Sequence, residues 1–484
     1  MRLLLFVFLI LSITCLPGFT ATITVAQDGS GDVNTIQNAV AMAAEGDDIL
    51  VLDSAVYDED LAAGPLAGFA AQFTLKAAEG QSPTLRAVNS AERLGAIGAP
   101  GADLLGAFFA GCVGVVIEGM TFENPTTDIN VLTISAAIAL MDCNDVVLRN
   151  CTIRGAGGPG TAYSGFNFGV LVSGQTIPSA GIVIEDCLIE QCHYGIQILK
   201  GTAGEPTDPS VTIRGCTIQN CNGNGIEMDC ASQPNPDEPS RSAIGDGHLI
   251  ENTQIINCEN AATLGGGKIV FRNCTLLGNR GSVNVDKQDS GELPILADFD
   301  QTAIVGSENI GVRVIGGRVS MTHCIVAGCF REGLYAAADA EEAIITVDHC
   351  DFYQNLVETP ELFELRLEAS IALDRKLTVS NTNVIGVAGI LNGTIDDPND
   401  YEEDAAIASY CNVLTDFESY INVTVDHEAS FDPLYANPQT DAALFSRAGF
   451  QLQEGSPALA AASDGGFIGS QGPIQTRLKH WMMY

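Results

Sequence analysis

Residues 211–229 read VTIRGCTIQNCNGNGIEMD and contain three short segments that are typical of β-strands. The segments cover residues 211–213, 217–218 and 225–228, and a Cys or a Cys/Asn-Gly turn separates each from the next. Strands this short do not form a stable sheet by themselves. They become stable where the unit repeats and each copy hydrogen-bonds to the next, so the stretch predicts a repeat protein.

The same frame recurs along the chain: an apolar residue, two variable residues, a marker, a variable residue and an apolar residue. With Cys216 as the reference, the markers are Gly119, Cys151, Cys187, Cys216, Thr253, Cys274, Thr302, Cys324, Cys350, Thr382 and Cys411. A second column, five residues after the marker, holds Asn124, Cys192, Cys221, Cys258, Asn279, Cys329 and Asn355. A constant frame with variable spacing favours stacked β-coils, whose turns accept insertions, over helical repeats.

A glycine-led strand often follows the second column, as in GIQI, GIEM, GVRV and GLYA. These patterns closely resemble the right-handed parallel β-helix proteins of the pectin-lyase-like superfamily, in which each coil has three strands and stacked Asn or Cys residues line an inner turn. The resemblance implies an all-β fold, a single-stranded right-handed parallel β-helix of about eleven or more coils with a short N-terminal capping helix. It says little about activity, because one fold supports many activities.

The chain divides into four regions. Residues 1–21 carry one Arg and then an apolar run, LLLFVFLILSITCL, and are interpreted as a secretory signal peptide. We expect an N-terminal cap with the first coils in residues 22–110 and the β-helix repeats in residues 111–415. Residues 416–484 are expected to form a C-terminal coil or cap segment, because FDPLYANP and EGSPAL resemble the DPLF and GSPA patterns that end many secreted bacterial β-helix proteins.

The N-terminal region predicts one helix and one coil. A DGSG turn is followed by a short amphipathic helix with Ile36, Ala39, Val40 and Ala43 on one face. Such a helix would cover the open end of the coil stack, which otherwise exposes apolar side chains and unpaired backbone. Residues 47–61, DDILVLDSAVYDEDL, alternate apolar and polar residues and are interpreted as the first coil.

The composition limits the partners. The net charge of −38 argues against DNA, RNA or anionic lipid, which bind basic surfaces. It also opposes binding of a polyanionic sugar, unless a cation such as Ca²⁺ is bound as well. The acidic run DDPNDYEED at residues 396–404 is either a Ca²⁺ loop or a solvated loop, and no other cofactor is indicated. No stretch after the signal peptide is apolar for long enough to predict a membrane helix, and we expect a secreted monomer.

The cysteines allow two interpretations. Seven of the 15 occupy the marker column and four occupy the second column. Coils stack about 4.8 Å apart, so Cys residues of neighbouring coils could form disulfides. Alternatively, Cys is a small buried residue in an interior ladder, and the regular columns favour this ladder. No pair has the CxxC spacing of a zinc site, so no metal ligation by Cys is expected.

Side chains that alternate along the glycine-led strand define a candidate site. Alternate residues of a strand point to opposite faces. The alignment of the strands therefore gives one outward polar column: Gln197, Glu227, Thr263, Asn284, Arg313 and Tyr335. Two residues further on lie Asp229 and Asp286. The alternative is that outward positions of any β-helix are polar without a function.

The resemblance implies that a substrate groove lies on this strand face. Glu227, Asp229 and Asp286 are then the candidate acid and base groups, and Arg313 is the candidate partner for a charged sugar or a lyase base. Asp229 and Asp286 would lie on the order of 10 Å apart, near the separation used by inverting glycosidases. Gln197, Thr263 and Asn284 would bind hydroxyl groups, Tyr335 could stack on a sugar ring, and His248 could approach from the loop at residues 229–247.

Two functions remain open after the sequence. The first is a protein that binds or processes a polysaccharide as a lyase, glycoside hydrolase or epimerase, supported by the polar column and by three insertions beside it, at residues 155–180, 229–247 and 287–294. The second is a non-catalytic adhesin or structural surface protein. The catalytic motifs of pectin esterases and polygalacturonases are absent, which favours the second.

Overall fold

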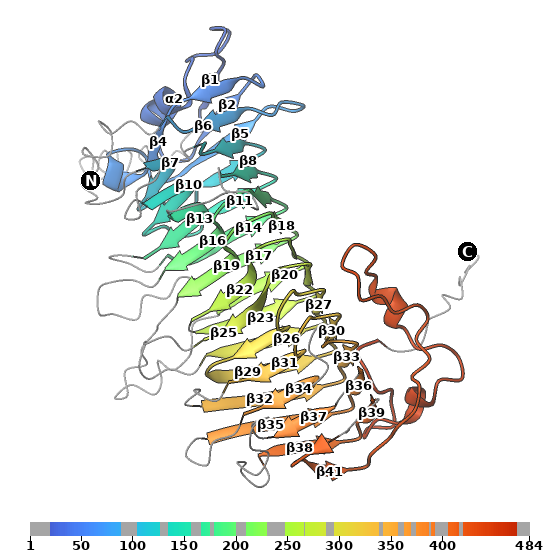
Figure 1. Ribbon diagram of the computed structural model, residues 1–484. Coiled ribbons are helices and arrows are strands. Elements are labelled where there is room, and N and C mark those ends of the chain that lie inside the picture. The colour runs from blue at the N-terminus through green and yellow to red at the C-terminus, as the bar shows by residue number, and fades with distance from the viewer. Residues whose placement is uncertain are drawn as a thin grey trace, which may run out of the picture.

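The computed structural model describes residues 20–88, 104–125, 134–155, 166–174, 179–199, 210–229, 247–265, 267–286, 295–337, 342–356, 363–368, 374–386, 389–392, 405–415 and 420–471. Their strands form three long parallel sheets, which we name A, B and C (Figure 1). The chain passes from sheet A to sheet B to sheet C in each coil and then returns to sheet A. The protein is thus a right-handed parallel β-helix, as the sequence predicts.

Sheet A has 15 strands, and its order follows the chain. They are β1 (Thr22–Val25), β2 (Asp47–Val51), β5 (Phe73–Ala77), β8 (Val116–Glu118), β11 (Val147–Arg149), β14 (Ile182–Glu185), β17 (Val211–Arg214), β20 (His248–Glu251), β23 (Lys268–Arg272), β26 (Leu296–Asp300), β29 (Gly317–Thr322), β32 (Glu342–Asp348), β35 (Asp374–Ser380), β38 (Ala406–Ser409) and β41 (Thr424–Asp426).

Sheet B has 13 strands in the same sequential order. They are β3 (Val56–Asp58), β6 (Thr84–Arg86), β9 (Thr121–Glu123), β12 (Thr152–Arg154), β15 (Leu188–Glu190), β18 (Thr217–Gln219), β21 (Gln254–Ile256), β24 (Thr275–Leu277), β27 (Ala303–Val305), β30 (Ile325–Ala327), β33 (Asp351–Tyr353), β36 (Asn383–Gly386) and β39 (Asn412–Thr415).

Sheet C also has 13 strands and carries the predicted polar column. They are β4 (Leu61–Ala63), β7 (Leu104–Ala110), β10 (Ile134–Met141), β13 (Phe166–Ser173), β16 (Tyr194–Leu199), β19 (Asn224–Asp229), β22 (Asn260–Leu264), β25 (Gly281–Val285), β28 (Val312–Val314), β31 (Leu334–Ala336), β34 (Leu365–Leu367), β37 (Ile390–Asn392) and β40 (Tyr420–Ile421).

The core lies inside the coil stack and follows the alternation of the strands. In β17, Val211 and Ile213 are buried, while Thr212 and Arg214 point outward. The parallel register places equivalent residues of successive coils on top of one another, such as Ile213 and Ile250. Apolar rows therefore run along the solenoid axis, and their burial is the main favourable contribution to folding.

The turn between sheets A and B explains the repeating frame. The residue before each marker adopts a left-handed backbone, with φ of 53° at Asn150 and 50° at Asn252. Asn tolerates this conformation better than most residues. Gly119 has the same conformation, with φ of 70°, and Glu118 pairs with Arg149. Gly119 therefore aligns with Asn150, and the assignment of Gly119 as a marker is wrong by one residue, since Met120 occupies the position of Cys151.

The cysteine ladder is confirmed for the part of the chain that the structure describes. All thirteen cysteines in it are free and buried: Cys112, Cys143, Cys151, Cys187, Cys192, Cys216, Cys221, Cys258, Cys274, Cys324, Cys329, Cys350 and Cys411. Eleven of these thiols contact backbone carbonyls, as in the contact of Cys216 Sγ with the Ile184 oxygen at 3.4 Å. Cys in this fold therefore acts as a small core residue.

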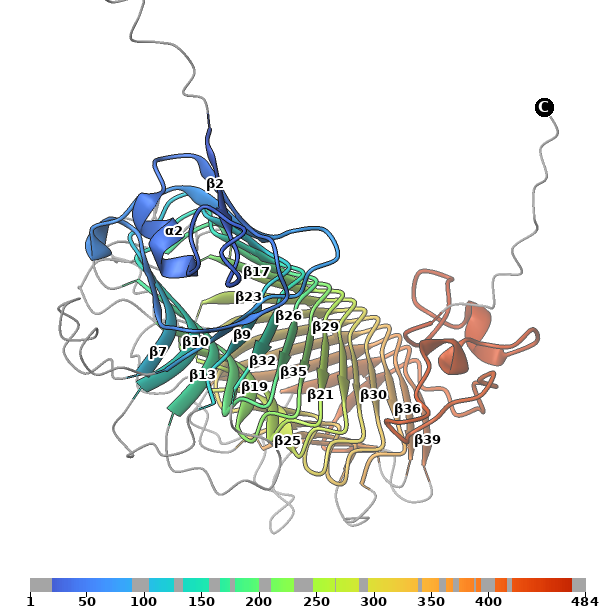
Figure 2. The same ribbon diagram turned by 90° about the horizontal axis from the view of Figure 1, so that it is seen from above.

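The N-terminal expectations are confirmed. Helix α2 (Ile36–Met42) begins at the cap Thr35, whose hydroxyl accepts from the Asn38 amide, and buries Ile36, Ala39 and Val40. It lies beside the first coils (Figure 2). The first coil consists of β2, β3 and β4. It covers the expected residues 47–61 and extends to Ala63 at the end of β4. The signal-peptide interpretation falls almost wholly on residues 1–19, outside the described residues.

The insertion expected at residues 155–180 is partly wrong. Residues Phe166–Ser173 form the eight-residue strand β13 of sheet C, which pairs with β10 and β16. The glycine-rich composition concealed a regular coil. The other two insertions, at residues 229–247 and 287–294, connect sheet C to sheet A, but nearly all of their residues lie outside the described part of the chain.

The C-terminal segment, residues 431–471, lies along the side of the solenoid instead of only closing its end (Figures 1 and 2). Phe450, Leu452 and Ile468 pack against the outward residues Val305 and Ala327 of sheet B. These outward positions are apolar, so the segment is held there by burial. Among the described helices, none combines the length and apolarity required to span a bilayer.

Candidate functional site

The register of sheet C confirms the outward polar column. Each residue pairs with the next on the neighbouring strand, in the order Gln197, Glu227, Thr263, Asn284, Arg313 and Tyr335. The alternate residues of the same strands, such as Ile226 and Val312, are buried in the core. Six residues from six strands therefore form one line along the outside of the sheet, spanning about 24 Å at the usual strand spacing.

Apolar residues continue the row beyond each end of the polar column. Towards the N-terminus, Gln197 pairs with Leu171, which pairs with Ala139. Leu171 and Ala139 belong to a buried apolar cluster on the outer face of sheet C. Towards the C-terminus, Leu391 continues the row and is buried against Phe363. The polar character is thus confined to the middle of the sheet.

Glu227 is held by a chain of amides. Asn260 Nδ2 donates to Asn224 Oδ1 at 2.8 Å, and Asn224 Nδ2 donates to Glu227 Oε2 at 3.0 Å. The neighbouring Tyr194 is half-buried; burial, with a smaller contribution from the negative charge of Glu227, raises its pKa to about 12. The carboxylate of Glu227 is therefore fixed in position on the sheet face.

Arg313 is the cation in the middle of the column. Its strand neighbours are Asn284 on one side and Tyr335 on the other. Its side chain is partly exposed, and no hydrogen bond or ion pair joins it to the described residues. A guanidinium presents five donors in a planar fork that matches carboxylates and pairs of oxygen atoms.

Asp229 and Asp286 lie in the same row as each other, two residues beyond the column. Asp229 ends β19 and pairs with Leu199, while the amide of Asp286 bonds the Leu264 oxygen of β22. The two residues are thus separated by two strand spacings, roughly 10 Å. The side chain of Asp229 lies outside what the structure describes, so its role as an acid or base stays a prediction.

His248 lies apart from the other candidate residues. It begins β20 of sheet A, pairs with Ile269, and is only 3% exposed. Burial lowers the pKa of its imidazole to about 4. The structure therefore does not bring His248 to the face of sheet C. His193, by contrast, lies in the turn before β16, where its Nδ1 is 3.0 Å from Asn222 Oδ1.

An ion-paired cluster lies at the end of the column, and its residues were not among those predicted from the sequence. Arg366 of β34 follows Tyr335 in the row, and its guanidinium bonds Glu332 at 3.0 Å and also Glu368. The Tyr335 hydroxyl donates to Glu368 Oε2 at 2.6 Å. Glu332 is fully buried, and Arg366 and Glu368 are each 8% exposed. The alternation in LRLE at residues 365–368 is the signal that could have identified these residues.

Glu364 is a second buried carboxyl near this cluster. Asn355 Nδ2 donates to Glu364 Oε2 at 2.7 Å, and the side chain is fully buried. Burial raises the pKa of Glu364 to about 8, against the smaller opposing effect of Asn355. The carboxyl is thus protonated at neutral pH.

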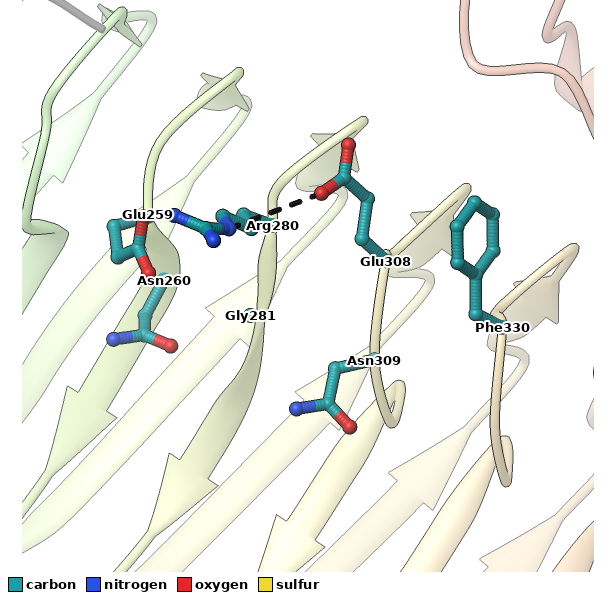
Figure 3. A pocket seen from close by; sticks show the side chains of 7 residues that line it. All are labelled: Glu259, Asn260, Arg280, Gly281, Glu308, Asn309 and Phe330. Carbon is teal, nitrogen blue, oxygen red and sulfur yellow. Dashed lines mark hydrogen bonds and ion pairs between the residues drawn. The ribbon is translucent and has the colours of Figure 1, made fainter. Parts of the chain in front are cut away.

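A shallow cavity of about 400 Å³ lies at the starting ends of β22, β25 and β28 (Figure 3). It is lined by Glu259, Asn260, Arg280, Gly281, Glu308, Asn309 and Phe330. Arg280 lies between two carboxylates, with its Nη1 3.1 Å from Glu259 Oε2 and its Nε 4.0 Å from Glu308 Oε2. This cavity was not predicted from the sequence, because its residues belong to turns of the repeat.

The described ranges contain no group of three or more His, Cys, Asp or Glu side chains that would hold a metal ion. The acidic run at residues 396–404 lies outside the described residues, so the Ca²⁺ expectation stays a prediction.

One comparison with known proteins supports the fold over part of the chain. A family model described as a right-handed beta helix region matches residues 101–237. A search of curated proteins found none that matches this chain.

Among solved structures, pectate lyase Pel9A is 8% identical with a TM-score of 0.40, covering 95% of this chain and 98% of that one. The PL6 family polysaccharide lyase from Pseudopedobacter saltans is 13% identical with a TM-score of 0.46, covering 89% and 97%. The A-module of mannuronan C-5 epimerase AlgE6 from Azotobacter vinelandii is 12% identical with a TM-score of 0.44, covering 83% and 96%. At such identities the likeness concerns the fold alone.

Proposed function

We propose that this protein binds a polysaccharide along the outer face of sheet C, in the polar column from Gln197 to Tyr335. The observation that carries the proposal is Arg313, a partly exposed guanidinium without a partner among the described residues, in the middle of a polar row. Arg149 of sheet A, by contrast, is ion-paired with Glu118 at 2.8 Å. Within the part of the chain that the structure describes, the guanidinium of Arg313 is therefore available for a ligand.

The column has the dimensions of a glycan site. Its residues repeat at the strand spacing of about 4.8 Å, comparable with the length of one pyranose unit. A glycan lying along the solenoid axis would meet a new polar side chain at each unit. Thr263 and Asn284, which are partly exposed, supply hydrogen bonds to hydroxyl groups, whereas Gln197 is only 4% exposed and marks the closed end of the column. The hydroxyl of Tyr335 is bonded to Glu368 and its ring contacts Arg366, so Tyr335 is held in place at the end of the column.

If the protein is catalytic, the acid and base groups belong to the same face. Glu227, fixed by Asn224, is the candidate acid or base for hydrolysis, together with Asp229 and Asp286. For β-elimination, Arg313 would be the base that removes the proton next to a uronate carboxyl group. These two reactions leave different products, which an assay separates.

A non-catalytic role, as an extracellular adhesin or surface protein, is the second candidate. The observation that favours it is the charge balance of the cluster beside the column. Arg366 pairs with both Glu332 and Glu368, and Arg331 pairs with Glu332 at 3.4 Å, so two guanidinium groups balance the two carboxylates and the cluster is structural. Either role fits an extracellular location, which cell fractionation would test.

A screen against acidic and neutral polysaccharides, with and without Ca²⁺, tests the proposal. Binding is measured by affinity electrophoresis, elimination by the ultraviolet absorbance of the unsaturated product, and hydrolysis by reducing ends. Retention by at least one glycan class supports the proposal. Absorbance would assign a lyase with Arg313 as base, reducing ends alone would assign a hydrolase, and no retention by any glycan would overturn it.

A further inference from the structure

The cavity at the turns and the polar column lie on the same strands. Asn260 of the cavity precedes Thr263 of the column by three residues on β22, and Gly281 precedes Asn284 by three on β25. Three residues of a strand span about 10 Å. The cavity therefore lies to one side of the column, at a right angle to the line that a glycan chain would follow.

The cavity is also joined to the column by hydrogen bonds. Asn260, which lines it, donates to Asn224, and Asn224 donates to Glu227 in the column. Gly281 makes room for this chain, because a Cβ atom there would lie 1.8 Å from Asn260 Oδ1. The backbone φ of Gly281 does not require glycine, so close approach of the Asn260 side chain explains the residue.

The side chains that line the cavity favour a neutral sugar over an acidic one. Figure 3 shows Arg280 between the carboxylates of Glu259 and Glu308, and Phe330 on the next coil beyond Glu308. Two carboxylates against one guanidinium leave a net negative charge, which disfavours an acidic sugar. Amides and charged groups bind vicinal hydroxyls, and an aromatic ring binds the apolar face of a pyranose.

We propose that this cavity is a second subsite, which binds a neutral sugar branching from a glycan chain that lies along the column. The inference rests on the proposed function, because the branch reaches the cavity from a chain on sheet C. Phe330 provides the apolar contact, and Arg280, Asn260 and Asn309 provide the hydrogen bonds. The substrate class is therefore a branched polysaccharide with neutral side units.

The test compares unbranched manno-oligosaccharides with galactosyl-branched counterparts, and xylo-oligosaccharides with arabinosyl-branched counterparts, by isothermal calorimetry. The full chain is used as the wild type and as Phe330→Ala, Gly281→Ala and Arg313→Ala. Arg272→Gln is the matched control, because Arg272 lies on sheet A with its side chain 54% exposed.

The wild type should bind a branched oligosaccharide about tenfold more tightly than its unbranched counterpart, the contribution of one aromatic contact. Phe330→Ala should abolish this preference and leave the affinity for the unbranched ligand unchanged. Gly281→Ala should reduce the preference by displacing Asn260. Arg313→Ala should lower the affinity for both ligands by the same factor, and Arg272→Gln should bind both ligands as the wild type does.

The outcomes separate the two proposals. Equal affinity of the wild type for branched and unbranched ligands would overturn the branch subsite. If Arg313→Ala then bound neither ligand, that result would still support a glycan site on the polar column. A preference that survives in Phe330→Ala would also overturn the branch subsite. Absence of binding to every oligosaccharide in both series would overturn this inference, and retention by other glycans in the screen above would leave the proposed function standing.

Discussion

The guanidinium of Arg366 lies over the ring of Tyr335, with its Cζ atom 5.0 Å from the ring centroid. The two residues are strand neighbours, so the contact follows directly from the register of β31 and β34. Arg366 also pairs with Glu332 and Glu368, and Tyr335 bonds Glu368. This cluster ends the polar column and fixes the one aromatic side chain within it.

Replacement of Arg366 by Met should destabilise the protein. The change leaves the fully buried Glu332 without its closer cation, and loss of one partner of a buried ion pair costs about 3–5 kcal/mol. Urea denaturation followed by circular dichroism measures the loss. Arg149→Met is the control, because Arg149 is 42% exposed, its partner Glu118 is 34% exposed, and the change should alter the free energy of unfolding by less than about 1 kcal/mol. Equal effects of the two variants would contradict the account.

Glu364 should make stability depend on pH. Its pKa is raised from 4.5 in the unfolded chain to about 8 in the fold. Between these two pKa values the folded state holds a proton that the unfolded state releases. The stability that protonated Glu364 contributes is therefore fully present below pH 4.5 and is lost as the pH rises through 8.

Glu364→Gln, which mimics the protonated acid, should remove this dependence. Relative to the wild type, the variant should gain stability between pH 5 and pH 8, by at most about 4–5 kcal/mol. Thermal melts of both proteins across this range measure the difference. A constant difference in Tm at all pH values would show that Glu364 is not protonated in the fold.

The C-terminal segment should detach when Asp351 is replaced. This buried carboxylate accepts from the Tyr435 hydroxyl, from Asn383 Nδ2 at 2.8 Å and from the Ser470 amide at 2.8 Å. Asp351→Ala leaves these donors buried without an acceptor, at a cost of about 1–3 kcal/mol for each. Limited proteolysis should then cleave within residues 431–471, while the β-sheet signal in circular dichroism persists.

Glu454→Ala is the matched control for that experiment, because Glu454 is an exposed carboxylate of the same segment. It should keep the wild-type resistance. Faster cleavage of the control, or an unchanged rate in Asp351→Ala, would mean that Asp351 does not hold the segment.

Reducing agents should leave the melting temperature unchanged. The thirteen described cysteines are free thiols in the interior ladder, so reduction breaks no bond among them. A thermal melt with and without dithiothreitol is sufficient to test this. A marked fall in Tm on reduction would show that disulfides stabilise the coil stack instead.

The sequence predicts the coils well because alternation and left-handed turn residues are local signals. The order from Gln197 to Tyr335 required only a common frame and the two-residue period of a strand, and the register confirms it. The misplaced marker at Gly119 has a local cause too, because Met120 replaces the usual small marker residue. A single long side chain was enough to shift the alignment.

Long-range packing was harder to predict. The outward positions of sheet B change from charged to apolar, from Arg154 and Glu190 to Leu277, Val305 and Ala327. That change is the signal for a covering segment, but only the fold shows that residues 431–471 supply it. The cluster around Arg366 was missed for a local reason, because its coil lacks the glycine-led frame that was used for the alignment.

The most direct test of the central claim is the affinity of Arg313→Ala for the polysaccharide that retains the wild type best. A guanidinium that binds the ligand directly should lower the affinity by at least tenfold when it is removed. Arg272→Gln on sheet A should bind as the wild type does. Wild-type affinity in Arg313→Ala would contradict a glycan site on the polar column of sheet C.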